Sequence, residues 1–171
     1  MIRASFIEGV RIEFIPGAQG QRVIVNGADW TRRVREADVN AAVSHVAAHP
    51  AVRERMVKLQ RAMGTYGRVV MEGRDIGTHV FPGAAFKFFL VAGDRTRAGR
   101  RHAELADAGM AADEGAVLHN IRERDRIDSS RAAAPLRRAP DAVEIDTSNM
   151  NVDEVLQRML AFMVSGGACP A

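Results

Sequence analysis

Two β-branched runs near the start of the chain predict an antiparallel hairpin. The runs are VRIEFI at residues 10–15 and RVIVN at residues 22–26, and residues 16–21 form a six-residue connection between them. Short runs of this composition on either side of a Pro- and Gly-containing stretch are typical of paired strands. A small antiparallel β structure is therefore expected in this part of the chain.

Helical spacing replaces the strand pattern in the next segment. Asp38 is placed to cap a helix, because apolar residues follow it at the spacing of one helix face. These residues are Val39, Ala42, Val43 and Val46. Pro50 ends this helix, since proline cannot continue the hydrogen-bond ladder, and a second apolar stripe begins at about Ala51. We expect two consecutive helices here.

Three apolar runs in the second half of the chain predict strands. They lie at residues 68–72, 86–92 and 142–146. The first two are almost continuously apolar, which is typical of strands buried on both faces, and the run at 86–92 is expected to be central in a parallel sheet.

Helices are predicted between and after these strands. One spans residues 94–109 with several arginines on its exposed side, and another begins at Asp113. A final amphipathic helix follows a cap at Asn151 or Ser148. Alternation of strands and helices from residue 68 onward predicts an α/β fold.

The composition is that of an ordinary globular domain. The chain has 171 residues, of which 47% are hydrophobic and 26% charged, enough for one well-buried core. No run approaches the roughly 18 apolar residues of a membrane helix, and the first residues lack a secretion signal. The single cysteine, Cys169, can form no internal disulfide. We therefore expect a cytoplasmic protein without a membrane partner.

Arginine carries almost all of the positive charge. The chain has 24 lysines and arginines and a formal net charge of +3, but its only lysines are Lys58 and Lys87. The planar donor fork of arginine suits phosphate and carboxylate groups. A GC-rich genome would also enrich arginine, together with alanine, glycine and valine. Only arginines that lie within motifs therefore carry functional weight.

The stretch at residues 68–78 is the first candidate site. Its apolar first half predicts a buried strand, and Glu72, Arg74 and Asp75 follow where that strand would end. Ligands of open parallel sheets bind at the carboxyl ends of strands, so these charges could hold a polar, planar ligand. In an alternative interpretation, Arg74 and Asp75 simply pair with each other beside a glycine turn.

A charged run at residues 122–131 is the second candidate site. Arg124, Asp128 and Arg131 are spaced by four and then three residues, so they share one helix face. Runs of this kind are usually solvated surface. Three aligned charges could equally close over a phosphate group.

Other chemistries find little support in the sequence. Among the five histidines, only His45 and His49 lie four apart, without the glutamate of a zinc helix, so no metal site is predicted. Neither a G-x-S-x-G elbow nor a dinucleotide-binding fingerprint occurs. One Trp and one Tyr offer little stacking surface, so no nucleic-acid partner is expected.

Four separated stretches together resemble the bacterial cytidylate (CMP/dCMP) kinases. They are VVMEGRDIGT at 69–78, FPGAAFKFFL at 81–90, RDRIDSSRAAAPL at 124–136 and DAVEIDTSNM at 141–150. The segment at 25–61 also resembles the CMP-binding insertion of that family. The resemblance covers nearly the whole chain, and several motifs in the same order make it specific.

The resemblance implies a P-loop nucleoside-monophosphate-kinase fold, in which a parallel sheet is covered by helices. The chain is then a single kinase-like domain at 1–171. It comprises a small antiparallel β/helical CMP-binding insertion at 8–65 and a partial core at 66–165, with a lid at 122–134. The activity implied is transfer of a phosphoryl group from ATP to CMP or dCMP, with Mg²⁺.

The resemblance also implies roles for the charged residues. Substrate-binding positions fall on Arg53, Glu72, Arg74, Asp75, Asp128 and Arg131, and catalytic positions fall on Arg124 and Arg131. A carboxylate can accept a hydrogen bond from a base amino group, and forked arginines hold phosphate and stabilise the charge of phosphoryl transfer. We expect four of these side chains to converge on one cleft, namely Arg53, Arg74, Asp75 and Arg131.

One family motif is absent. Kinases of this type open with a Gly-rich loop, G-x-x-x-x-G-K-[ST], but here Lys58 precedes Leu59 and Lys87 precedes Phe88. We expect the body of the family without its N-terminal segment, and so without the first, central strand of the sheet. The ATP-binding loop is then missing from this chain, no ATP or metal site is supported by it, and the chain alone should be inactive.

Three interpretations stay open. The first is a cytidylate kinase whose N-terminus lies outside this sequence, through truncation or a misplaced start. The second is a non-catalytic nucleotide-binding or interaction protein derived from such a kinase, and the third is an Arg-rich nucleic-acid binder. The intact substrate and lid charges favour the first.

The missing strand would leave a slot between two others. The runs at 68–72 and 86–92 would then carry unpaired backbone groups, which are costly when buried and invite pairing at an open edge. The two strands are expected to pair directly, to self-associate with another copy through the open slot, or to leave the protein poorly soluble.

Overall fold

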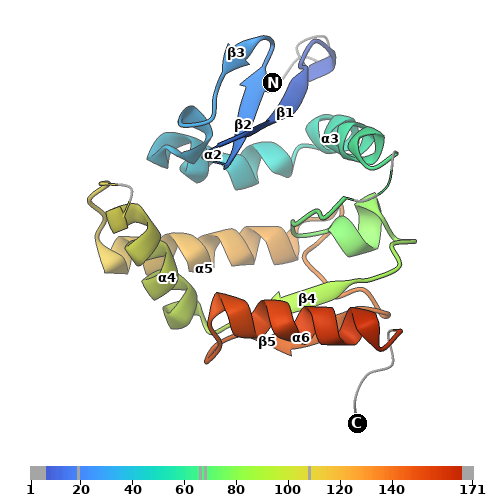
Figure 1. Ribbon diagram of the computed structural model, residues 1–171. Coiled ribbons are helices and arrows are strands. Elements are labelled where there is room, and N and C mark those ends of the chain that lie inside the picture. Colours follow the sequence, from blue (N-terminus) through green and yellow to red (C-terminus); the bar gives the residue numbers. More distant parts are fainter. Residues whose placement is uncertain (1–6, 19, 66, 68, 108, 167–171) are drawn as a thin grey trace. The chain divides into compact units, whose positions relative to one another are not determined.

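The structure is a computed structural model, and it forms two compact units (Figure 1). It describes residues 7–18, 20–65, 67, 69–107 and 109–166. The first unit comprises Met1–Met71 and Arg131–Ala133, and the second comprises Glu72–Ser130 and Ala134–Ala171.

The first unit opens with a three-stranded antiparallel sheet in the order β1-β2-β3. Its strands are β1 (Ile12–Gly17), β2 (Gly20–Val25) and β3 (Ala28–Asp29). The predicted hairpin is confirmed, but its connection is shorter than six residues. Pro16 and Gly17 continue β1 and pair with Gln21 and Gly20. Proline is tolerated here because β1 is an edge strand, where its missing N–H interrupts no ladder.

A tight turn joins β2 to β3. Asn26 and Gly27 both have positive φ angles, 49° and 80°. Asn-Gly with two left-handed residues is the preferred two-residue hairpin turn, because its twist matches that of the strands. The Asn26 side chain also accepts a hydrogen bond from the Arg11 backbone N–H at 2.8 Å.

Two helices complete the first unit, after a 3₁₀ turn at Arg33–Arg35 (η1). They are α2 (Ala37–Ala47) and α3 (Pro50–Met63), with Pro50 in the first turn of α3. The prediction that Asp38 caps α2 was wrong. Glu36 occupies the N-cap position, and Asp38 lies inside the first turn, where a carboxylate suits the positive end of the helix dipole.

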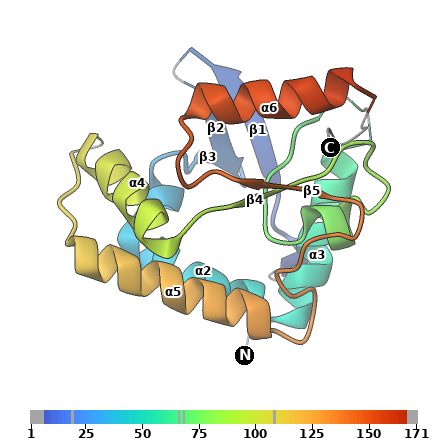
Figure 2. The ribbon, with the colours of Figure 1, turned by 90° about the horizontal axis from the view of Figure 1, so that it is seen from below.

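The second unit is built on a two-stranded parallel sheet, β4 (Phe88–Val91) with β5 (Val143–Asp146). Helices α4 (Asp94–Asp107) and α5 (Glu114–Ser130) lie between the strands in sequence, and α6 (Val152–Val164) follows them. In Figure 2, α6 runs along one face of the strand pair and α5 lies on the opposite side. The strand–helix alternation predicted for this part of the chain is thus confirmed from residue 86 onward.

Helix α6 has the predicted cap and an apolar contact with the sheet. The Asn151 side chain accepts from the Glu154 N–H at 2.9 Å, and the Glu154 carboxylate accepts from the Asn151 N–H at 2.7 Å, which is a capping box. Phe162 packs edge-on against Phe88 of β4, with ring centroids 5.6 Å apart. The capping box thus defines the first turn of α6, and the ring contact packs its last turns against β4.

The strand predicted at 68–72 was wrong. Arg68 lies outside the described residues, and residues 69–72 have no strand pairing, with Val70 96% exposed. A strand forms only where a neighbour completes its hydrogen bonds, and no described segment supplies one here. Apolar sequence alone did not create a strand.

The central position predicted for β4 was also wrong. Among the described residues β4 pairs only with β5, so its other edge is open. Leu90, in the middle of the strand, is 50% exposed. The run at 86–92 is therefore an edge strand in the residues that the structure describes.

The arginines of α4 also depart from the prediction of a simply exposed face. Arg97 donates a hydrogen bond to the Ala92 carbonyl, and Arg100 donates to Thr147 and to the Met150 carbonyl in the loop after β5.

No helix among the described residues is long and apolar enough to cross a membrane.

Candidate functional site

The loop that carries Glu72, Arg74 and Asp75 is held in one shape by its own backbone. The Asp75 carbonyl accepts hydrogen bonds from the N–H groups of the three residues Thr78, His79 and Val80, at 3.3, 2.8 and 3.3 Å. These bonds close a short π-turn, Ile76–Val80 (η2). Val80 is 2% exposed and anchors the end of the turn in the core of the second unit.

Gly73 leaves room for the Ile76 side chain in this loop. A β-carbon at this position would lie 2.9 Å from Cγ1 of Ile76, closer than real contacts allow. The glycine therefore lets the chain fold tightly beside η2, with Arg74 directly after it.

Asp128, near the end of α5, is the centre of a charged cluster. Asp128 is only 3% exposed. The Nε atom of Arg74 lies 3.5 Å from its Oδ2 atom, and the Nε atom of Arg124 lies 3.8 Å from the same oxygen. We call these three residues the Asp128 cluster. It unites charges from the two stretches, 68–78 and 122–131, that the sequence singled out separately.

The arginines of the Asp128 cluster are close enough to oppose each other. Burial of the Arg124 guanidinium lowers its pKa from the ordinary value, and the positive charge of Arg74 lowers it further, while Asp128 and Asp125 act in the opposite direction. Arg124 Nε is buried and forms no hydrogen bond with any described residue. An added anion near the two guanidinium groups would relieve this repulsion.

Two neighbouring arginines of α4, Arg97 and Arg100, make structural contacts. Arg97 donates from Nε to the Ala92 carbonyl at 3.0 Å and pairs with Asp125 at 2.6 Å. Arg100 donates to the Thr147 hydroxyl at 3.1 Å and to the Met150 carbonyl at 2.9 Å. These bonds tie α4 to α5 and to the loop after β5. Sequence reasoning missed them, because 28 or more residues separate most of the partners.

The remaining predicted site residues are spread over both units. Glu72 is exposed and Asp75 half-buried in the second unit. Arg53 belongs to α3 of the first unit, where one of its nitrogens donates to the Ala47 carbonyl at 3.4 Å. Arg131 also belongs to the first unit. Convergence of these residues on one cleft therefore stays a prediction.

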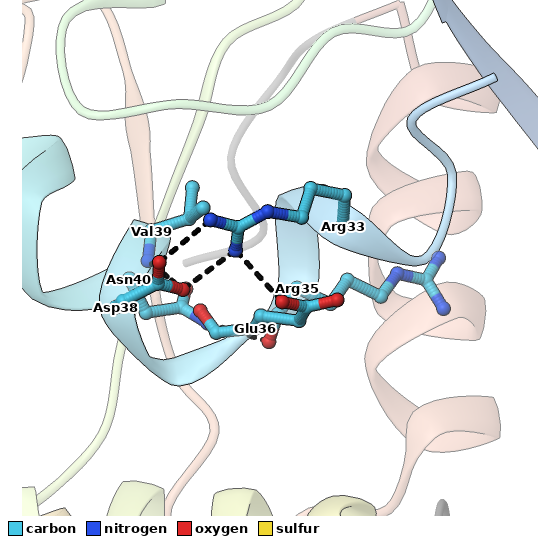
Figure 3. A network of polar contacts seen from close by, with 6 residues as sticks. All are labelled: Arg33, Arg35, Glu36, Asp38, Val39 and Asn40. Carbon is cyan, nitrogen blue, oxygen red and sulfur yellow. Dashed lines mark hydrogen bonds and ion pairs between the residues drawn. The ribbon is translucent and has the colours of Figure 1, made fainter.

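The first unit contains a charge cluster of a different kind (Figure 3). Arg33 donates to both carboxylate oxygens of Asp38 at 2.6 Å and to Glu36 at 2.8 Å. The hydrogen bond from Arg33 is the main cause that lowers the pKa of Asp38 from 3.8 to about 2. All three side chains are largely exposed. This arrangement, the Arg33 clamp, joins η1 to the first turn of α2.

The Asp128 cluster suits an anion better than a metal ion. Two guanidinium groups face one carboxylate, so the local charge is positive, and Mg²⁺ prefers several oxygen ligands. Among the described residues no group of three metal-ligating side chains occurs. Paired arginines bind phosphate through forked, charge-assisted hydrogen bonds. Chemistry of this kind fits a phosphorylated substrate.

Comparison with known proteins places the chain in a family. The sequence model of the family described as Cytidylate kinase matches residues 3–165. The chain belongs to the cytidylate kinase family. It is 50% identical to the cytidylate kinase of Anoxybacillus flavithermus over 152 residues, which are 89% of this chain and 68% of that protein.

Other cytidylate kinases match over a similar extent. The cytidylate kinase of Geobacillus kaustophilus is 51% identical over 156 residues, 91% of this chain and 70% of the relative. That of Bacillus subtilis is 43% identical over 157 residues, 92% and 70% of the respective chains. Family membership supports a nucleotide-kinase function and the α/β kinase fold. It also implies use of ATP and Mg²⁺.

The described residues do not provide a cradle for ATP phosphates or Mg²⁺. Neither lysine of the chain is followed by serine or threonine, so the usual lysine and hydroxyl donors are not in these 171 residues. The family's cofactors therefore find no matching donor set in this chain.

Proposed function

We propose that this polypeptide carries the acceptor side and the lid of a cytidylate kinase, which phosphorylates CMP or dCMP to CDP or dCDP at the expense of ATP. In this proposal Arg74 and Asp75 hold the nucleotide, with Glu72 beside them. Asp128 orients Arg74, and Arg124 stabilises the charge that develops during transfer.

The Asp128 cluster is the observation that supports this proposal most strongly. A buried carboxylate at 3.5 and 3.8 Å from two arginine Nε atoms sets their positions without using their outer nitrogens. The side chains of Arg74 and Arg124 are 40% and 41% exposed. Their outer nitrogens can therefore reach a phosphate, as a substrate-binding arginine must.

Arg53 and Arg131 extend the same proposal to the first unit. Both match substrate positions of the family, and Arg131 follows directly after α5, which carries Arg124 and Asp128. We infer that each of these two arginines contributes to substrate binding, Arg53 from the insertion and Arg131 from the lid. Substitution of either by methionine should weaken CMP binding by about tenfold, which titration calorimetry can measure.

We further propose that the 171-residue chain alone does not transfer phosphate. Phosphoryl transfer depends on positioning and on charge stabilisation at the β- and γ-phosphates, which the Gly-rich loop and its lysine supply in such kinases. Loss of one comparable donor costs roughly 10²- to 10³-fold in rate in other enzymes. Loss of the whole cradle should therefore bring the rate below detection.

A coupled assay with ATP and CMP tests both parts of the proposal. The chain alone is compared with the same chain fused, ahead of Met1, to a segment that carries G-x-x-x-x-G-K-[ST] in a strand–loop–helix context. We expect CDP formation only by the fused protein. CDP formation by the short chain, abolished by Arg131→Ala, would contradict the inactivity of the chain alone.

A non-catalytic nucleotide-binding protein is the second candidate. It is favoured if the fused protein binds CMP, measured by titration calorimetry, but produces no CDP. If neither protein binds CMP, the assignment of the Asp128 cluster to the substrate is wrong.

The open edge of β4 also supports a proposal of self-association. The β4–β5 ladder includes the bonds from Val143 N–H to the Lys87 carbonyl and from Thr147 N–H to the Val91 carbonyl. By alternation, the backbone groups of Phe88 and Leu90 face the other edge, which pairs with no described strand. Such an edge pairs readily with a second copy of itself.

Sedimentation at several concentrations tests this second proposal. We expect a dimer that dissociates when Leu90 is replaced by lysine, since charge blocks edge pairing. A concentration-independent monomer would rule out pairing through β4.

A further inference from the structure

Lys87 is a nearly buried lysine of the second unit that lies outside the Asp128 cluster. Its side chain is 6% exposed and lies just before β4. Its ammonium group donates to the Pro82 carbonyl and pairs with the Asp141 carboxylate at 2.5 Å. The hydrogen bond from Lys87 is the main cause that lowers the pKa of Asp141 below 3.8. The ion pair is thus a defined contact of the second unit.

The aliphatic part of Lys87 supports the substrate loop. A β-carbon at Gly77 would lie 3.4 Å from Cδ and 3.7 Å from Cγ of Lys87, and 3.7 Å from Cβ of Ala139. The backbone of η2 therefore rests directly on the lysine stem. Gly77 is three residues after Arg74, within the loop that the Asp75 carbonyl closes.

Lys87 thus joins three segments at one point. Its stem lies under η2, its ammonium holds the turn at Pro82 and the turn at Asp141, and its carbonyl accepts from the Val143 N–H at 2.9 Å. The last bond adjoins the β4–β5 ladder. The position of the loop relative to the sheet is set at this residue.

The burial of a charge at this point argues for positioning more than for stability. Removing an ammonium group from water costs about as much as a buried ion pair returns, so an apolar residue of the same length would serve stability equally well. An ammonium group adds direction, because it fixes the carbonyl and the carboxylate that it binds.

We propose that Lys87 is a positioning residue that holds the substrate loop, and with it Arg74, in register with Asp128. The proposal rests on the function proposed above, since Arg74 is assigned there to the nucleotide. Lys87 itself touches no substrate. It acts through Gly77 and Pro82 on the loop between them.

Two variants and a matched control test this role. Lys87→Met keeps an unbranched stem and removes the ammonium. Asp141→Asn removes the partner charge at a side chain that is 65% exposed, so that variant should fold. Lys58→Met is the control, because Lys58 is the only other lysine in the sequence, is 66% exposed and pairs with Glu54 within α3.

Hydrogen exchange is the first measurement, and it does not depend on CMP. In Lys87→Met the amides of Thr78, His79 and Val80 should exchange about tenfold faster, while those of α6 keep their rates. Lys58→Met should change neither set. Unchanged exchange at residues 78–80, or an equal rise in α6, would overturn the positioning role.

CMP affinity, measured by calorimetry on the full chain, is the second measurement. Lys87→Met should raise Kd about tenfold and Asp141→Asn should raise it by less, because Lys87 keeps its hydrogen bond to the Pro82 carbonyl in the second variant. The double variant should match Lys87→Met, since the contact with Asp141 is already lost there. Independent, additive effects would overturn the proposal. If wild-type protein binds no CMP, the proposed function fails, and the exchange measurement alone decides the role of Lys87.

Discussion

The Arg33 clamp and the Asp128 cluster use the same residue types in opposite ways. In the clamp, one arginine meets two carboxylates through hydrogen bonds of 2.6 to 2.8 Å, and all partners are exposed. In the cluster, one buried carboxylate faces two arginines at 3.5 and 3.8 Å. The arginine of the clamp donates hydrogen bonds to both carboxylates, whereas the two arginines of the cluster lie at longer, ion-pair distances from theirs.

The difference distinguishes a structural ion pair from a candidate binding site. Arg33 has directed its donor fork at protein carboxylates, so little remains for a ligand. Arg74 and Arg124 form no hydrogen bond through their side chains with any described residue, and their charges oppose each other. Excess positive charge around a buried anchor is what a phosphate-binding site requires before its ligand arrives.

The largest effect is expected on turnover. In the protein fused to a Gly-rich loop, Arg124→Met should lower kcat about 10²- to 10³-fold, because a donor to the developing phosphate charge is lost. Arg33→Met should leave kcat within about twofold. The coupled ATP and CMP assay measures both. Equal losses in the two variants would remove the distinction between clamp and cluster.

The next effect is on stability. Asp128→Asn should lower the free energy of unfolding by about 3 kcal/mol, because a partly buried arginine pair then lacks its countercharge. Asp107→Asn, at an exposed site at the end of α4, should change it by less than about 0.5 kcal/mol. Urea denaturation compares the two. A cluster variant as stable as wild type would show that Asp128 is not the anchor.

The smallest effect concerns the pH dependence of the Arg33 clamp. The Asp38 pKa is lowered to about 2 in the folded protein, so the clamp stabilises the fold above the ordinary value of 3.8. That contribution is lost as the pH falls through about 2, when the carboxylate takes up a proton. The small difference in Tm between wild type and Asp38→Asn should therefore be present at neutral pH and vanish in strong acid.

Circular dichroism melts between these extremes measure the difference, with Arg33→Met as a parallel variant. Both variants should converge on wild type as the pH falls. A difference in Tm that grows in acid would mean that the carboxylate is stabilised in its protonated form.

Most elements of the fold could be predicted from local patterns. The capping box of α6, the β-branched hairpin and the strand at 142–146 carry their signals within a few residues. The strand expected at 68–72 failed because pairing depends on a neighbour, which the sequence of the run itself does not contain. Whether this apolar run forms a strand thus depends on a neighbouring strand that can pair with it.

The sequence predicted which residues belong to the candidate site. It did not predict which of them lie next to one another in the folded chain. Spacing placed Arg124 and Asp128 on one face of α5, and the ion pair between them agrees. The approach of Arg74 to Asp128 joins residues 54 positions apart in sequence, and no periodicity indicates it. The ion pairs of Arg97 and Lys87 were missed for the same reason, since their partners Asp125 and Asp141 lie 28 and 54 residues away in sequence.

Calorimetric titration of CMP into the 171-residue chain tests the central claim most directly. We expect binding by wild type, a Kd about 10- to 100-fold higher in Arg74→Met, and an unchanged Kd in Arg33→Met, because a charge-assisted hydrogen bond to phosphate contributes about 1.5 to 3 kcal/mol. Equal affinities of wild type and Arg74→Met would contradict the assignment of the Asp128 cluster to the nucleotide.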